Sequence, residues 1–140
     1  MIKFTVYGQP VAQGRPKFTT AGGFARAYDP AKSKDYKSLV YEQALAVRPA
    51  ELITGAVGVK IDAYFQIPKS KSNKWKLAAR EDRIKPTTKP DADNIAKGIC
   101  DSLNGLIWRD DSQVAGLLVS KYYSDNPRVE VSIMEDGDDE

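Results

Sequence analysis

A long alternating run near the middle of the chain constrains the fold more than any other feature. Between residues 56 and 67, apolar side chains fill every second position: Val57, Val59, Ile61, Ala63, Phe65 and Ile67. Successive side chains of a strand point to opposite faces, so this pattern predicts a β-strand with one buried face. Gly55 and Pro68 bound the run. The chain must therefore form a sheet around this strand and cover its apolar side.

The other segments supply partners for that strand. Strand patterns cover residues 2–7, 114–123 and 129–133, and helical spacing predicts helices over 30–48, around 75–80 and over 93–104. Residues 8–30 are rich in Gly and Pro and are expected to form a long loop. This order predicts an α/β (α+β) fold in which one mixed β-sheet packs against two main helices. Residues 1–134 are expected to form a single small domain, followed by a disordered acidic tail, 135–140.

Composition excludes several classes of function. The chain has no histidine and one cysteine, Cys100, which excludes His-based triads, His-liganded zinc and an intramolecular disulfide. It has no run of about 18 apolar residues that would indicate a membrane span. Its first residues read as a strand rather than as a signal peptide. We therefore expect a cytoplasmic protein with no membrane partner and no organic cofactor, whose chemistry rests on carboxylates, Lys, Tyr or a bound metal.

Charge is spread unevenly along the chain. The net charge is +2, but the last six residues hold five acids, and removing those five negative charges leaves +7 for the rest. Segment 69–89 holds eight Lys or Arg against two acids. This asymmetry favours a polyanionic partner, usually nucleic acid, over a solvated basic loop. The candidate DNA-binding residues of this segment are Lys69, Lys71, Lys74, Lys76, Lys85 and Lys89.

Two further basic residues, Arg15 and Lys17, lie in the Gly- and Pro-rich loop beside Phe18. Basic residues among aromatic ones can hold phosphates and stack on bases. The alternative is a loop whose aromatic rings pack on the domain, and the sequence leaves both interpretations open.

Three other side chains have structural interpretations. Trp75 is expected to anchor the basic segment, because Trp is highly buried on average. Trp108 is expected in the core, where it would hold the following Asp-rich turn in place. Cys100 occupies a core position of its helix and is expected to behave as a small buried apolar group.

An acidic pair, Asp91 and Asp93, lies at the start of the helix expected over 93–104. Residues two apart lie about 200° apart around a helix axis, but they share a face in extended backbone. Lys89 precedes a proline and is biased to extended geometry, so the pair is expected on the lead-in, with Asp93 at or near the cap. Asp93 and Lys97 are then about one turn apart and within reach of each other. Taken alone, the pair is better explained by helix capping.

A second acidic pair, Asp110 and Asp111, follows the same helix. Taken alone it is typical of an Asp-rich turn. Together the pairs indicate more, because folding of the apolar segment 95–107 can bring them into one pocket. Clustered carboxylates repel one another, and a cation relieves the repulsion. Oxygen ligands favour Mg²⁺, with Mn²⁺ as a substitute, over zinc. Such an ion beside DNA can orient a water and stabilise charge on the scissile phosphate, which suits phosphodiester hydrolysis.

These motifs resemble those of a known family. The segments D-A-D-N-I-A-K, residues 91–97, and W-R-D-D-S-Q-V, residues 108–114, are similar to the paired signature D-x-D-N-x-x-K and W-x-D-D-x-Q-V. That signature is typical of the RusA family of Holliday-junction resolvases, which is common in prophages. Close similarity covers residues 90–114, and looser similarity covers most of the domain. The 69–89 segment and the acidic tail depart from the shorter family members.

The resemblance implies a RusA-like fold and a homodimer. Such a dimer would bind four-way DNA junctions and resolve them by paired, symmetric, Mg²⁺-dependent nicks in DNA recombination and repair. Carried over residue by residue, Asp91, Asp93 and Asp111 would be the metal-binding catalytic carboxylates, and Lys97 the essential lysine. The accessory residues would be Asp110 and Asn94. Two alternatives stay open: a nuclease acting on flaps or replication forks, and a catalytically inactive junction-binding protein.

Overall fold

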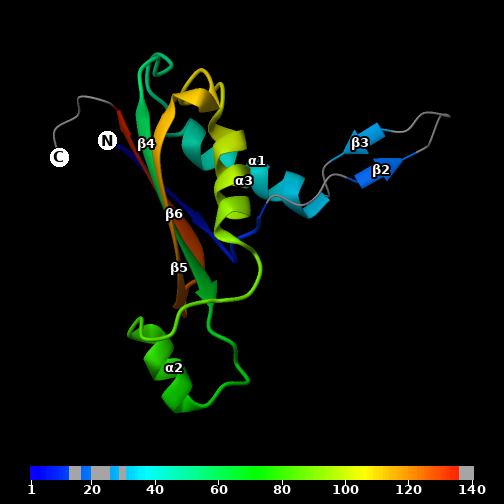
Figure 1. The fold of residues 1–140 in the computed structure, drawn as a ribbon, viewed down its shortest axis with the longest axis vertical. Helices are drawn as coiled ribbons and strands as arrows, with labels where there is room; N and C mark the ends of the chain where they lie inside the picture. The colour runs from blue at the N-terminus through cyan, green and yellow to red at the C-terminus, as the bar shows by residue number, and fades with distance from the viewer. Residues whose placement is uncertain (13–16, 20–25, 29–30, 136–140) are drawn as a thin grey trace.

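A four-stranded mixed sheet, covered on one face by two helices, forms the body of the molecule (Figure 1). The computed structural model describes residues 1–12, 17–19, 26–28 and 31–135. The strand order is β1-β6-β4-β5, and the strands are β1 (Ile2–Tyr7), β6 (Arg128–Glu135), β4 (Val57–Gln66) and β5 (Val114–Ser124). β6 is antiparallel to both of its neighbours, whereas β4 and β5 are parallel. The predicted α/β (α+β) fold with one mixed sheet and two main helices is confirmed.

β4 carries the core, as its alternating sequence predicts. Its buried side chains form one face of the sheet, while Lys60 and Gln66 on the opposite face are exposed. β6 pairs with β4 along most of its length and buries Val129, Val131 and Ile133 on the same side. Burying one Val or Ile side chain contributes roughly 1.5–3 kcal/mol. This strand pair is therefore the main stabilising element of the domain.

Helices α1 (Ala31–Leu45) and α3 (Ala92–Leu103) pack on that apolar face (Figure 1). Each buries side chains at a four-residue spacing: Tyr36, Val40 and Ala44 from α1, and Ile95, Ile99 and Leu103 from α3. This spacing places one apolar stripe of each helix against the sheet. Gly105 follows α3 with a φ of +81°, in the left-handed region that favours glycine. Its N–H donates to the Trp108 carbonyl at 2.8 Å, so the chain folds back directly after the helix.

The connection between β4 and α3 forms a separate small unit at one end of the sheet (Figure 1). We call residues 68–89 the α2 lobe, after its helix α2 (Asn73–Arg80), which confirms the short helix predicted there. Ser72 caps this helix, because its side-chain oxygen accepts a hydrogen bond from the Trp75 N–H at 3.2 Å.

The expectation of a long loop over residues 8–30 was wrong in part. The described residues of this segment include β2 (Lys17–Thr19) and β3 (Arg26–Tyr28), which pair antiparallel. Strands of three residues are too short to show a period-two pattern among Gly and Pro. At the other end of the chain, Glu135 ends β6, and the rest of the acidic tail lies outside the described residues. No helix in the described part of the chain has the length and hydropathy needed to cross a membrane.

Candidate active site

Asp91 lies immediately before α3, on extended backbone as predicted. It is the N-cap residue, with φ −72° and ψ 150°, and its carbonyl accepts a hydrogen bond from the Ile95 N–H at 3.1 Å. Its carboxylate makes no capping hydrogen bond, although an N-cap aspartate usually does. Helix capping therefore does not account for this exposed side chain.

Asp93 was expected on the extended lead-in together with Asp91, but it lies in the first turn of α3, because the helix begins at Ala92, directly after Asp91. Its side chain is also exposed. Within the described part of the chain, neither Asp91 nor Asp93 forms an ion pair with Lys or Arg. Asn94, the next residue, is exposed as well. The start of α3 thus presents two carboxylates whose oxygens are not engaged by cationic side chains of the described residues.

The two residues of the second acidic pair, Asp110 and Asp111, have different surroundings. Asp110 caps the short 3₁₀ helix η2 (Asp111–Gln113), because its carboxylate accepts a hydrogen bond from the Ser112 N–H at 2.9 Å. Hydrogen bonds from Ser112 hold the pKa of the Asp110 carboxyl below its usual value. Gln113 completes the turn by accepting from the Asp110 N–H at 2.8 Å and donating to the Ile53 carbonyl at 2.7 Å. The structural interpretation as an Asp-rich turn therefore fits Asp110.

Asp111 is oriented by a buried tryptophan. The indole Nε1–H of Trp108 donates to Asp111 Oδ1 at 2.9 Å, and Trp108 itself is 0% exposed. A buried aromatic ring has little freedom to move, so this hydrogen bond fixes the direction of the carboxylate. The expectation that Trp108 lies in the core and holds this turn is confirmed.

Asp93 and Asp111 line one hollow of about 450 Å³ beside α3. The other side chains of its wall come from α3 and from the start of β5: Ala96, Lys97, Cys100, Asp101, Val114, Ala115 and Leu117. The structure thus brings together one carboxylate from each acidic pair. Asp91 and Asp110 are not part of the described lining, since Asp91 precedes the helix and Asp110 is used by the turn.

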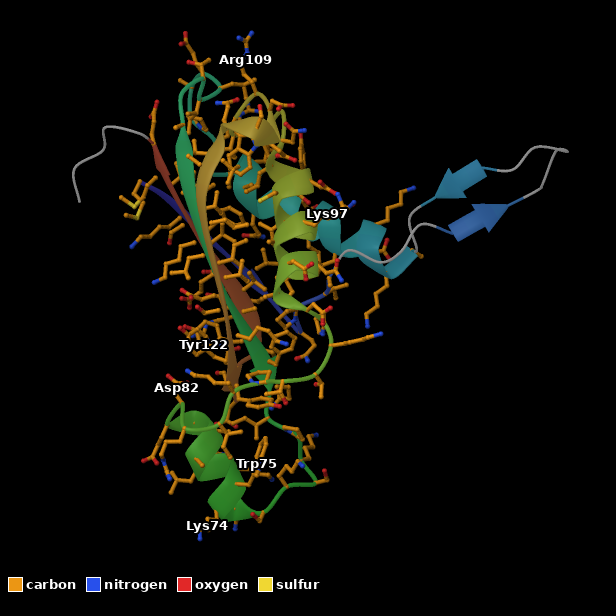
Figure 2. All side chains as sticks on the ribbon, viewed as in Figure 1. Lys74, Trp75, Asp82, Lys97, Arg109 and Tyr122 are labelled. Atoms are coloured by element: carbon orange, nitrogen blue, oxygen red, sulfur yellow. The ribbon has the colours of Figure 1, made fainter. Side chains whose placement is uncertain are left out.

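Lys97 projects from α3 beside this hollow (Figure 2), but its ionic partner differs from the predicted one. Its Nζ lies 3.9 Å from Oδ2 of Asp101, and no ion pair with Asp93 occurs among the described side chains. Oδ2 of Asp101 also lies 3.5 Å from Nζ of Lys37 on α1. A lysine on a helix can reach an acid four residues before or after it. Lys97 pairs with Asp101 rather than Asp93, and we attribute this to Lys37, which helps to fix the Asp101 carboxylate between the two helices.

Cys100 is half-buried and borders the hollow, rather than being fully buried as expected. Burial raises the pKa of its thiol to about 11, and the negative charges of Asp111 and Asp101 contribute to the rise. The thiol is therefore protonated at neutral pH and is a poor nucleophile.

The donor atoms of the hollow suit a hard divalent cation. Asp93 and Asp111 offer carboxylate oxygens, the ligands that Mg²⁺ prefers, whereas Asp101 is already neutralised by two lysines. The described residues contain no group of three or more His, Cys, Asp or Glu side chains arranged to hold a metal ion. A third ligand would therefore have to join these two, and Asp91, two residues before Asp93, is the nearest acid along the chain.

The candidate DNA-binding lysines of segment 69–89 lie in the α2 lobe. Five of them are exposed and Lys76 is half-buried. Lys85 is partly engaged, because its Nζ lies 4.3 Å from the centre of the Tyr122 ring and 3.8 Å from Asp82 Oδ1. Of the other two candidates, Arg15 lies outside the described residues, and only the backbone of Lys17, in β2, is described.

Asp101 is the residue of this site that the sequence interpretation missed. Its signal was its spacing, since it lies four residues after Lys97 and eight after Asp93 on the same helix. Residues at that spacing share one helical face. A single aspartate on a helix is a weaker sequence signal than the two acidic pairs on either side of it.

Comparison with known proteins gives two matches. Residues 7–134 match the family model described as Endodeoxyribonuclease RusA, which takes in both acidic pairs and Lys97. A protein of Bacillus subtilis (strain 168) named Uncharacterized protein YqaN is 53% identical to this chain over 136 residues, which cover 96% of each of the two chains.

Proposed function

The chain belongs to the RusA family of endodeoxyribonucleases, and from that premise we propose that it resolves Holliday junctions by paired, symmetric nicks in DNA recombination and repair. Family membership supports cleavage of DNA, while the four-way junction, the metal ion and the dimer are the specific parts of the proposal. The observation that carries it is that Asp93, from the start of α3, and Asp111, from the turn before β5, line the same hollow.

In this proposal the carboxylates of Asp93 and Asp111 hold Mg²⁺, for which Mn²⁺ can substitute, and Asp91 joins them from the helix N-cap. When bound, the ion supplies Lewis-acid stabilisation of the scissile phosphate and activation of a water. The hydrogen bond from Trp108 Nε1–H holds the Asp111 carboxylate in its orientation.

Lys97 lies on the wall of the same hollow and is 64% exposed, so it can approach a phosphate oxygen of the bound DNA. A positive charge fixed beside the scissile phosphate stabilises the charge that develops in the transition state. Asp101 positions this ammonium group and does not itself contact substrate in the proposal.

Resolution also requires two hollows, because a four-way junction is resolved only when two strands are nicked symmetrically. We therefore propose that the active form is a homodimer with one hollow per protomer. Sedimentation of the protein with and without junction DNA measures this directly, and a monomer that nicks both strands in one binding event would contradict it.

The test is nicking of a synthetic four-way junction by Asp91→Asn, Asp93→Asn and Asp111→Asn. Each substitution keeps the shape of the side chain but removes its charge, and we expect the Mg²⁺-dependent rate to fall by at least on the order of 10³-fold. Junction binding in EDTA should remain. The matched control is Asp82→Asn in the α2 lobe, whose φ of 63° asparagine also tolerates, and it should cut normally.

Substrate choice separates the proposal from its alternatives. We expect the native protein to cut the four-way junction in preference to a replication fork and a linear duplex at the same salt concentration. Preference for the fork would support the flap and fork nuclease instead. Binding without any Mg²⁺-dependent product would support the inactive junction-binding protein, and equal cutting by the three carboxylate variants would contradict the metal site.

A further inference from the structure

The α2 lobe is fixed to the end of the sheet by several side-chain contacts. The Trp75 ring packs edge-on against Tyr123 of β5, with 5.3 Å between ring centres. Arg80 donates two hydrogen bonds to the carboxylate of Asp125, at 2.6 and 3.3 Å, in the turn between β5 and β6. Side chains of α2 itself therefore contact the end of the sheet, so the position of the helix does not depend only on its two connecting segments.

The segment that leads from α2 back to α3 is fixed as well. Nζ of Lys121 on β5 donates to the Thr88 carbonyl at 2.7 Å. Nζ of Lys85 lies over the Tyr122 ring at 4.3 Å. A basic loop that only improved solubility would need none of these contacts. Their number indicates that the lobe is held in a defined position relative to the sheet.

Six of the eight Lys and Arg residues of the lobe fall into two groups, and the other two are Lys76, which is half-buried, and Lys89, at the end of the lobe. Around the C-terminal end of α2, the cations have acidic partners: Arg80 with Asp125, Arg83 with Glu81, and Lys85 with Asp82. Around the other end, Lys69, Lys71 and Lys74 are exposed and form no ion pair with a carboxylate among the described residues. Lys71 instead lies 5.1 Å from the centre of the Trp75 ring. Lys69, Lys71 and Lys74 lie within six residues of one another along the chain at the start of the lobe, and we call these three positive charges the lobe tip.

The lobe tip is remote from the hollow. Figure 2 shows Lys74 at the outer end of the lobe, whereas Lys97 lies on α3 beside the sheet. A phosphate at the hollow and a phosphate at the lobe tip must therefore belong to different parts of a long or branched polyanion. Three ammonium groups that have no carboxylate partner among the described residues suit the DNA backbone, whose phosphates attract Lys without regard to sequence.

We propose that the lobe tip is a second DNA contact, which binds backbone phosphates of one duplex arm while the hollow engages the strand to be cut. The inference rests on the proposed function for its substrate. Because the lobe is fixed to β5 and to the β5–β6 turn, the tip would hold that arm at a set position relative to the hollow, and we expect this to favour branched over linear DNA.

The test compares DNA binding by Lys69→Gln/Lys74→Gln with that by the native protein in EDTA over a range of salt concentrations. Lys71 is kept, because its contact with Trp75 belongs to the support of the lobe. Losing two phosphate contacts should reduce the slope of log K against log salt by about 1.8 and weaken junction binding on the order of tenfold. The matched control, Lys3→Gln/Arg48→Gln, removes two exposed charges away from the lobe and should leave the slope unchanged.

A second variant, Trp75→Ala, keeps every charge and removes one anchor of the lobe. We expect it to lower affinity for the four-way junction several-fold more than affinity for a linear duplex. Unchanged binding by Lys69→Gln/Lys74→Gln, or an equal loss in the control, would overturn the proposal, as would unchanged junction preference in Trp75→Ala. If the native protein shows the salt slope but nicks no DNA, the proposed function fails while the lobe-tip contact stands.

Discussion

The hollow beside α3 and the tip of the α2 lobe are held in place by different means. The carboxylates of the hollow stand on elements whose opposite faces are fully buried: Ile95 and Ile99 of α3, and Trp108 before the turn, are at most 1% exposed. In α2 only Ala79 is buried, and the lobe depends on surface contacts such as Trp75 with Tyr123. Packed cores fix side chains closely, whereas surface ion pairs contribute little each.

The difference agrees with what each region is proposed to do. Catalysis tolerates errors of only a fraction of an ångström in the position of reacting groups. A lysine that contacts a phosphate acts as a point charge on a flexible stem and tolerates more. Substitutions that loosen the hollow should therefore affect the rate of nicking, and substitutions that loosen the lobe should affect binding.

The largest effect that sharpens this comparison is expected for Trp108→Phe. Phenylalanine fills most of the buried site but lacks the Nε1–H that orients Asp111. We expect roughly 1–3 kcal/mol lower stability and a rate of single-turnover nicking lower on the order of tenfold per folded molecule. Thermal melting and quenched-flow nicking measure the two effects. Ile133→Val, a core substitution on β6, is the control and should lower stability without lowering the rate of nicking. A native rate of nicking in Trp108→Phe would contradict the role given to the Trp108–Asp111 hydrogen bond.

A smaller effect is expected for Asp101→Asn. Loss of its charge removes the counter-ion that lies 3.9 Å from Lys97 Nζ, so the ammonium group samples more positions. An exposed helical ion pair is worth roughly 0.2–1 kcal/mol, which corresponds to at most about a fivefold lower rate of nicking at saturating junction. Affinity for the junction should not fall, and Asp101→Glu should restore part of the rate. A fall in affinity without a change in rate would show that Asp101 does not position Lys97.

The smallest effect concerns pH and the anchor of the lobe. Arg80 holds the pKa of the Asp125 carboxyl below its usual value of about 3.9. A depressed pKa means that this ion pair stabilises the folded lobe at neutral pH, and that the contribution is lost only as pH falls through the depressed value. Asp125→Asn should therefore weaken junction binding slightly at pH 7, with no change in nicking rate at saturation. Titration to acid should move the fluorescence of Trp75, identified by difference from Trp75→Phe, less in this variant than in the native protein.

Much of the fold was predictable because its main elements are long and strongly patterned. β4 and α3 repeat apolar residues over several periods, whereas the apolar pattern of α1 is weak. The observed bounds of all three elements differ from the predicted ones by three residues or fewer. The β2–β3 pair was missed because three-residue strands carry no period. Strand order and the parallel pairing of β4 with β5 depend on contacts between segments remote in the chain, which a local pattern does not contain.

The site was predictable in its residue types but not in its side-chain partners. Spacing placed Asp91 on extended backbone and Asp111 next to a core tryptophan, and both features are present. It did not distinguish Asp110, which the turn uses, from Asp111, which faces the hollow. Nor did it find that Lys97 pairs with Asp101, since that choice depends on Lys37 from another helix.

The place of the α2 lobe in the chain has a consequence for how such proteins can diverge. The lobe is inserted between β4 and α3, and its anchors are surface contacts to β5 and the β5–β6 turn rather than members of the core. Connections of this kind accept changes of length and composition far more readily than packed elements do. Changes in the length or charge of the lobe could therefore alter the DNA contact proposed for the lobe tip without disturbing the carboxylates that would carry out the cut.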